Sequence, residues 1–204
     1  ISISSPIEEK KIFFVWPEGI IPNTYEDQLD LYNDIFKKYF SENHLIGLGI
    51  TSRKTINNDY SYYNSFSIFD SQLNLIENYN KINLVPFGEF VPVENILNKF
   101  GLKTITNNIG SFNKGDNRNI IQLKNGNKKL NFLPLICYEI IYSGNLTKNF
   151  DFDFILNISE DGWFGKSIGP KQHFIHSKFR AVENGKYIIR SSNNGMAAII
   201  NPLG

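Results

Sequence analysis

Short apolar runs alternate with polar segments along the chain and predict strands separated by helices and turns. The runs that have the length and turn-forming borders of strands cover residues 12–15, 45–50, 63–69, 73–79, 120–123, 130–136, 154–158, 187–189 and 196–200. The segment "DSQ" joins the third run to the fourth, and "KNGNKK" joins the fifth to the sixth. Each of these turn-rich connections predicts a β-hairpin.

Two longer segments carry apolar residues at helical spacing. Residues 25–40 predict a helix whose apolar positions are Leu29, Leu31, Tyr32, Ile35, Phe36, Tyr39 and Phe40. Asn23 or Thr24 is expected to cap this helix, and Glu26 and Asp27 lie near the positive end of its dipole.

The second predicted helix covers residues 172–184 and ends at Gly185. Its expected inward-facing residues are Phe174, Ile175, Phe179 and Val182. A further short helix is predicted at 93–100. Strands connected both by hairpins and by helices predict a mixed α/β fold in which helices cover the sheets.

Composition excludes several classes of protein. The chain is 41% hydrophobic and 20% charged, which is typical of a globular domain, and its 204 residues fit one domain. A net charge of +1 gives no strong field toward nucleic acid or an anionic membrane, so we expect no nucleic-acid partner. Cys137, the only cysteine, forms no internal disulfide. Neither it nor the three histidines has metal-ligand spacing, so no metal site is expected.

Three polar residues follow predicted strands at positions where a ligand site would form. Glu18 comes after the first strand, Lys81 after the hairpin strand at 73–79, and Cys137 directly after the run at 130–136. Functional groups tend to gather at strand ends in α/β sheets. Each residue also has an ordinary interpretation, because Cys137 could be core packing and Glu18 and Lys81 could be solvated loop residues.

Together these three side chains are sufficient for acyl transfer through a thioester. A thiol near its usual pKa of about 8.5 is mostly protonated at neutral pH, so it needs a base such as a carboxylate. A lysine ammonium stabilises both the thiolate and the oxyanion of a tetrahedral intermediate. The backbone N–H that follows a nucleophile at a sharp turn adds a second oxyanion donor.

The sequence motifs around these residues are more specific for one family than the three residues alone. The segments "WPEGIIP" at 16–22, "YNKINLVPFGEFVP" at 79–92, "LICYE" at 135–139, "NISEDGWFGKSIGPKQH" at 157–173 and "RAVENGKYIIRSSNNGMAAIINPLG" at 180–204 occur in this order. In combination they resemble the nitrilase-like domain of the bacterial apolipoprotein N-acyltransferase family. The resemblance covers nearly the whole chain from about Phe13 and implies an αββα sandwich with mixed sheets.

The resemblance implies a role for each site residue. Glu18 matches the general base, Lys81 the oxyanion-stabilising lysine and Cys137 the nucleophile of the nitrilase superfamily. Active-site support is expected from Glu89, Tyr138 and Glu139, with Glu139 supporting the site rather than acting as its base.

Other motif residues have implied structural roles or depart from the family. Arg180, Glu183, Asn193 and Asn194 match shared elements for which a scaffold role is favoured over chemistry. Glu160 stands where many relatives are expected to carry asparagine, which bears on loop contacts and not on the triad.

The resemblance also implies the reaction and its setting. The phospholipid is the expected acyl donor, and the amine of a diacylglyceryl-cysteine apolipoprotein is the expected acceptor, with no cofactor. The expected location is the bacterial cell inner membrane, with the catalytic domain facing the periplasm. The chain starts at Ile1 without methionine, and no apolar stretch approaches a membrane span. We therefore expect residues 1–204 to be one catalytic domain, truncated at both ends, whose membrane segments lie outside this chain.

Two other functions remain open at this point. A soluble carbon–nitrogen hydrolase could use the same Glu–Lys–Cys triad on an amide or a nitrile. The segment "YNKINLVPFGEFVP" disfavours it, because soluble relatives resemble that segment only loosely. A non-catalytic lipid- or lipopeptide-binding domain could keep the scaffold, but such a domain has no need of all three of Glu18, Lys81 and Cys137.

Overall fold

The computed structural model describes residues 11–56, 58–90, 112–125, 128–144 and 146–204. The helix predicted at 93–100 lies outside these residues. Two mixed sheets form the centre of the molecule. The first has the strand order β1 (Ile12–Val15), β2 (His44–Ile56), β3 (Asp59–Phe69) and β4 (Leu75–Asn80). β1 is parallel to β2, and the other two pairs are antiparallel.

The second sheet contains the later part of the chain. Its order is β5 (Ile121–Asn125), β6 (Lys128–Ile136), β7 (Phe154–Glu160), β8 (Tyr187–Asn193) and β9 (Ala198–Ile200). The three central strands β6, β7 and β8 are parallel, and an antiparallel strand lies at each edge. Both predicted hairpins are therefore confirmed.

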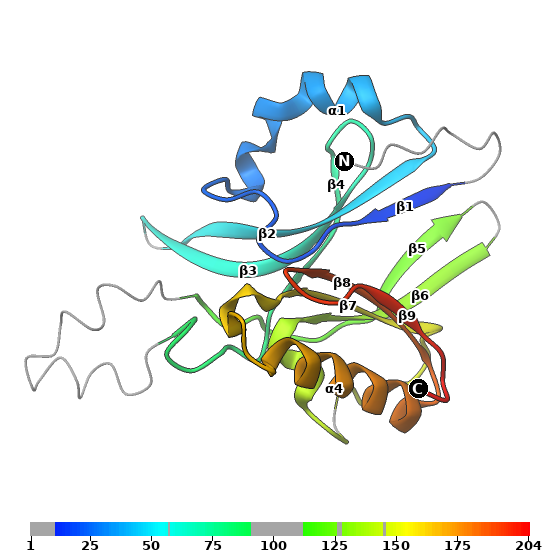
Figure 1. The fold of residues 1–204 in the computed structure, drawn as a ribbon. Coiled ribbons are helices and arrows are strands. Elements are labelled where there is room, and N and C mark those ends of the chain that lie inside the picture. Colours follow the sequence, from blue (N-terminus) through cyan, green and yellow to red (C-terminus); the bar gives the residue numbers. More distant parts are fainter. Residues whose placement is uncertain (1–10, 57, 91–111, 126–127, 145) are drawn as a thin grey trace, which may run out of the picture.

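The two sheets pack face to face, and one helical layer covers each outer face (Figure 1). The 3₁₀ helix η1 (Glu26–Tyr32) and α1 (Asn33–Tyr39) cover the first sheet, and α4 (Gly169–Asn184) covers the second. This order confirms the αββα sandwich. Two more short 3₁₀ helices, η2 (Cys137–Ile141) and η3 (Asp161–Phe164), begin directly where β6 and β7 end.

Alternation of side chains along the strands creates three separate apolar cores. The core between the sheets includes Phe66, Ile68, Phe132, Phe154 and Leu156. Neighbours on the opposite face of the second sheet pack under α4, namely Leu133, Leu135, Ile155 and Ile188. The third core joins the first sheet to its helical layer through Leu29, Phe36, Ile46 and Leu48. Among the described residues, no helix combines the length and apolar character needed to cross a membrane.

The prediction that four residues of α4 face inward is wrong for three of them. Ile175, Phe179 and Val182 are 42%, 56% and 55% exposed, while Phe174 packs partly against the core. The residues that α4 buries are His173, Ser177, Arg180 and Ala181. Three of these are polar and are buried because they enter hydrogen bonds under the helix, which a count of apolar residues does not reveal.

The predicted helix at 25–40 is divided into η1 and α1, and its N-terminal flank is Tyr25 instead of Asn23 or Thr24. The Tyr25 backbone N–H donates to Gln28 Oε1 at 3.1 Å. Leu29 and Phe36 are buried, whereas Leu31 and Ile35 are 80% and 51% exposed. β2 and β3 also extend beyond the predicted strands and form a long hairpin. The prediction ended too early because the outer halves of these strands alternate too weakly in hydrophobicity.

Two phenylalanines test this assignment of core and surface. Phe132 is fully buried and stacks on Phe154 with ring centroids 5.3 Å apart, whereas Phe179 lies on the exposed face of α4. We expect Phe132→Ala to lower the free energy of unfolding by about 3–5 kcal/mol. The control Phe179→Ala should change it by less than about 0.5 kcal/mol, as measured by urea denaturation. Equal losses in the two variants would contradict the assigned layers.

Candidate active site

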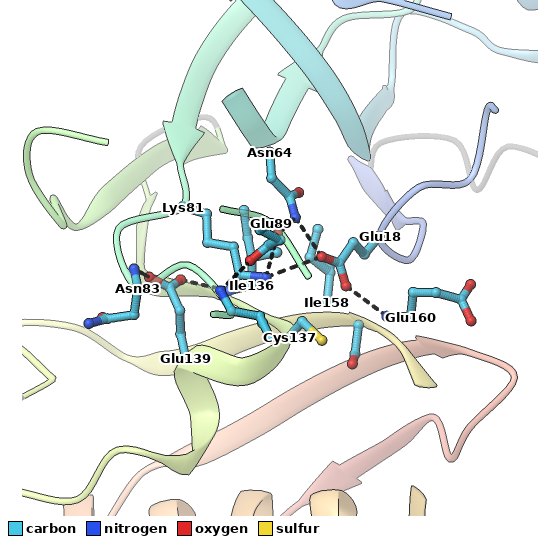
Figure 2. Close-up of polar contacts among 12 residues, drawn as sticks. Glu18, Asn64, Lys81, Asn83, Glu89, Ile136, Cys137, Glu139, Ile158 and Glu160 are labelled. Carbon is cyan, nitrogen blue, oxygen red and sulfur yellow. Dashed lines mark hydrogen bonds and ion pairs between the residues drawn. The ribbon is translucent and has the colours of Figure 1, made fainter. Parts of the chain in front are cut away.

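The ends of three strands bring Glu18, Lys81 and Cys137 to one cavity of about 760 Å³. Glu18 lies in the turn after β1, Lys81 directly follows β4, and Cys137 directly follows β6. Two of these residues come from the first sheet and one from the second, so the cavity opens where the sheets meet. Figure 2 shows the Cys137 sulfur below Glu18 and the Lys81 side chain. The predicted gathering of these residues at strand ends is thus present.

Lys81 is the centre of a buried charge cluster. Its Nζ lies 2.9 Å from Glu89 Oε1 and 3.4 Å from Glu18 Oε1, and the residue is 1% exposed. Asn64, on β3, donates from Nδ2 to the same two carboxylate oxygens at 2.6 Å each (Figure 2). Lys81 and Asn64 therefore bridge the same pair of carboxylates, which fixes Glu18 beside the thiol.

The surrounding charges keep Lys81 cationic despite its burial. Burial alone would lower the pKa of Lys81, but the negative charges of Glu18 and Glu89 raise it above its usual value. The second oxygen of each carboxylate is also held. Glu18 Oε2 accepts from the Glu160 backbone N–H, and Glu89 Oε2 accepts from that of Val85, both at 2.8 Å. Glu89 thus lines the same cavity as Glu18, Lys81 and Cys137.

Cys137 has a backbone conformation that is rare for a residue with a side chain. Its φ of +50° lies in the left-handed region, which costs such residues about 1–2 kcal/mol. Burial, together with the charge of Glu18, raises the pKa of the thiol to about 12, although Lys81 and Ser159 oppose this effect. The resting thiol is therefore protonated at neutral pH, and its reaction depends on a base.

Glu139 is fully buried and is not part of the cavity wall. Its carboxylate accepts from the backbone N–H groups of Ile82, Asn83 and Ile136 at 2.9, 3.0 and 2.9 Å. Side-chain donors complete the set, with Tyr79 Oη at 2.9 Å and Arg118 Nη2 at 2.6 Å. The carboxylate connects the segment after Lys81 to the residue before Cys137 (Figure 2).

Tyr138 lines the cavity beside Cys137, and its ring meets Tyr142 edge-on at 5.5 Å between centroids. Its backbone N–H belongs to the first turn of η2, where such groups have no partner within the helix. This N–H is the expected second oxyanion donor. The sequence prediction placed Tyr138 at the site, and the structure places it in the cavity wall.

A second buried polar cluster touches Cys137 through its backbone. His173 Nε2 lies 3.1 Å from the Cys137 carbonyl oxygen, and Nδ1 lies 2.8 Å from Asp161 Oδ1. Arg190 Nη2 donates to both oxygens of Asp161 at 3.1 and 2.9 Å. Sequence reasoning missed Asn64, Asp161 and Arg190, and considered His173 only as a metal ligand. Their only signal was polar residues within otherwise buried segments.

The remaining cavity wall is mostly apolar. It contains Ile50, Val85, Phe112, Ile141, Trp163, Phe164 and Ile168. Trp163 and Ile168 are 79% and 65% exposed, so the aromatic segment "DGWF" presents apolar surface at the rim instead of filling a core. Within the described ranges, no group of three or more His, Cys, Asp and Glu side chains is arranged to hold a metal ion.

The residues assigned to the scaffold make contacts that stabilise neighbouring loops. Arg180 Nε lies 2.6 Å from Glu183 Oε2, and Arg180 Nη1 donates to the Ile141 carbonyl at 3.1 Å. The side chains of Asn193 and Asn194 donate to the Glu160 carboxylate. Glu160 therefore joins the end of β7 to the end of β8 and to the residue that follows it.

Comparison with known proteins identifies relatives along most of the chain. It is 37% identical over 198 residues to an apolipoprotein N-acyltransferase of Rhizobium leguminosarum bv. trifolii, covering 96% of this chain and 36% of the relative. The enzyme of the same name from Wigglesworthia glossinidia brevipalpis is 39% identical, with 100% and 40% covered. That from Agrobacterium fabrum is 36% identical, with 100% and 39% covered. The chain thus spans less than half the length of these curated relatives.

Solved structures with low sequence identity share the fold. A mutant of the amidase from Nesterenkonia sp. AN1 aligns with a TM-score of 0.54 at 13% identity, covering 94% of this chain and 72% of the other. A CN-hydrolase superfamily protein from Xanthomonas campestris also gives 0.54, at 14% identity and 94% and 70% coverage. The profile of the carbon-nitrogen hydrolase family matches residues 14–204. This chain therefore belongs to the carbon-nitrogen hydrolase family.

Proposed function

We propose that this chain is the catalytic domain of an apolipoprotein N-acyltransferase, which moves a fatty acyl chain from a phospholipid to the N-terminal amine of a diacylglyceryl-cysteine apolipoprotein. One observation carries the proposal: Glu18, Lys81 and Cys137 meet in a largely apolar cavity. Its volume of about 760 Å³ lies within the range of roughly 300–1,000 Å³ typical of ligand sites. An apolar cavity beside a nucleophile favours an acyl chain over a small polar amide.

The relatives support the same choice. Those 36–39% identical to the chain are named apolipoprotein N-acyltransferases. The structurally similar amidase is only 13% identical, and this likeness concerns the fold alone. The soluble amidase or nitrilase alternative therefore has no specific observation in its favour. A purely binding function leaves the Lys81 cluster and the left-handed Cys137 unexplained.

In the first half-reaction, Cys137 Sγ attacks the carbonyl carbon of the phospholipid ester while Glu18 accepts the thiol proton. The C=O bond opens to an oxyanion, which Lys81 Nζ and the Tyr138 N–H stabilise. The oxyanion then collapses, the ester C–O bond breaks, and the departing lysophospholipid oxygen takes the proton from Glu18. The product on the enzyme is a Cys137 thioester.

In the second half-reaction, the apolipoprotein amine attacks the thioester carbonyl carbon. Glu18 accepts a proton from the attacking nitrogen, and the same two donors stabilise the new oxyanion. When the intermediate collapses, the C–S bond breaks and the thiolate recovers the proton from Glu18. The amide product leaves, and the thiol returns to its protonated form.

Both proposed substrates carry lipid, so we place the reaction at the bacterial cell inner membrane, on its periplasmic face. The exposed apolar rim formed by Trp163 and Ile168 supports this location, because it offers apolar surface where a lipid chain enters. No organic cofactor or metal takes part in the proposed scheme, since the three side chains supply nucleophile, base and charge.

The thioester can be detected directly. We expect the purified protein to gain the mass of one fatty acyl chain after incubation with phospholipid vesicles. Hydroxylamine should release it, and Cys137→Ala should prevent it. Intact-mass spectrometry with peptide mapping checks the site of attachment. A folded protein that gains no acyl mass while it hydrolyses small amides would replace this proposal with the amidase function.

Removal of the base should change the pH dependence of acyl-enzyme formation. In Glu18→Gln we expect a loss of about 10²–10⁴-fold at pH 7. The remaining rate should rise about tenfold per pH unit below the thiol pKa, because only the thiolate then reacts. Loss of the Glu18 charge lowers that pKa from about 12, but burial keeps it above the usual value. Wild type should show a shallower profile, and an identical profile in both proteins would contradict the assigned base.

Lys81→Met tests the oxyanion donor with a side chain of similar length. Loss of one such donor typically costs about 10²–10³-fold in rate. We expect a decrease of at least this size in acyl-enzyme formation, measured in a single turnover. Circular dichroism and urea denaturation identify the folded fraction, because Lys81 also pairs with Glu18 and Glu89. A folded variant with the normal rate would exclude the role of Lys81.

A further inference from the structure

The Asp161–His173 pair contacts Cys137 at a position that the triad does not occupy. His173 comes from α4 and is 4% exposed, and Asp161 comes from the start of η3 and is fully buried. The ring spans from the Asp161 carboxylate to the Cys137 carbonyl oxygen. Because carbonyl and carboxylate oxygens accept, Nε2 donates to the Cys137 carbonyl and Nδ1 donates to Asp161 Oδ1.

The Cys137 carbonyl and the Tyr138 N–H belong to the same planar peptide unit and point in opposite directions. A hydrogen bond that fixes the carbonyl oxygen therefore also fixes the direction of the Tyr138 N–H. The same contact opposes rotation of Cys137 out of its left-handed conformation at φ +50°. One hydrogen bond from His173 thus bears on both the nucleophile and the expected oxyanion donor.

The Asp161 carboxylate has hydrogen-bond donors other than His173. It already accepts from Arg190 and from the hydroxyls of Ser159 and Ser192, at 2.7 Å and 3.0 Å for the two serines. Burial alone would raise the pKa of Asp161, but its contacts with His173 and Arg190 hold it well below the usual range. A fixed carboxylate of this kind orients the imidazole toward Cys137.

We propose that His173, oriented by Asp161, is a positioning residue that holds the Cys137 turn and aims the Tyr138 N–H into the cavity. The inference rests on the proposed function of the site, since the oxyanion is that of the acyl-transfer reaction. His173 does not touch the reacting atoms in this assignment. It acts through the Cys137 peptide group, so its loss should lower the rate of chemistry and leave substrate binding nearly unchanged.

Two variants of His173 separate positioning from simple packing. His173→Gln keeps an N–H donor that reaches about as far as Nε2, whereas His173→Leu removes the donor and keeps the bulk. We expect His173→Leu to reduce the single-turnover rate of acyl-enzyme formation about 100-fold, which is typical of a small misplacement of catalytic groups. The phospholipid concentration at half-maximal rate should stay within about twofold. The single-turnover rate of His173→Gln should be at least tenfold higher than that of His173→Leu.

Alkylation of Cys137 by iodoacetamide provides a readout that does not depend on acyl transfer. The charged side chains that act on this thiol are Glu18 and Lys81, and Glu89 and Glu160 also line the cavity. Asp161 and His173 reach it through the Cys137 carbonyl. In wild type the rate of alkylation should still rise with pH at pH 10, because the thiol pKa is about 12. In His173→Leu the relaxed turn exposes the thiol, so its titration midpoint should move toward the usual value of about 8.5. His173→Gln should keep the wild-type profile.

His44→Gln is the matched control, because His44 is also a buried histidine bonded to the backbone, accepting from the Ser41 N–H, but it lies at the start of β2, outside the site. We expect wild-type alkylation in this variant. Equal rate losses in the Gln and Leu variants of His173, or an unchanged alkylation profile in His173→Leu, would overturn the positioning role. If wild type forms no acyl-enzyme but the alkylation profiles still divide as described, the proposed function fails and the positioning role stands.

Discussion

The buried carboxylate of Glu139 is the constraint on which the geometry of the site depends. Backbone N–H groups from Ile82, Asn83 and Ile136 converge on it from two sheets, together with Tyr79 and Arg118. Charge-assisted hydrogen bonds contribute about 1.5–3 kcal/mol each, and removal of one partner of a buried pair costs about 3–5 kcal/mol. Residues next to Lys81 and Cys137 are thereby held to one common point. Neither sheet alone could fix the distance between the amine and the thiol.

The electrostatics of the cavity explain why a carboxylate must accompany the thiol. A thiolate would be stabilised by Lys81, but Glu18 and Glu89 already share that cation. Burial and the nearby Glu18 therefore keep the proton on sulfur until a substrate arrives. In the proposed mechanism this arrangement ties activation of the thiol to Glu18, which the Glu160 N–H and Asn64 hold in place.

Sequence patterns predicted the strands of the second sheet and both hairpins, because a strand buried on both faces is a short apolar run with turn-forming residues at its borders. The same logic failed for α4, whose buried face carries His173, Ser177 and Arg180 while Phe179 is exposed. The prediction that Glu18, Lys81 and Cys137 share a site came from the motifs around them, because spacing along the chain does not reveal that distant residues meet. Asn64, Asp161 and Arg190 stayed hidden for a physical reason: their importance comes from tertiary hydrogen bonds, which leave no periodic signal along the chain.

The polar inner face of α4 and the strained turn at Cys137 depend on each other. A left-handed residue persists only where its surroundings over-determine it. Here Glu139 accepts from the N–H of Ile136, just before the turn, while His173 donates to the carbonyl of Cys137 itself. The turn is thus held on one side by an acceptor, Glu139, and on the other side by a donor, His173. An apolar α4 would have improved the core, but it would have left the Cys137 carbonyl buried without a donor and the turn free to relax.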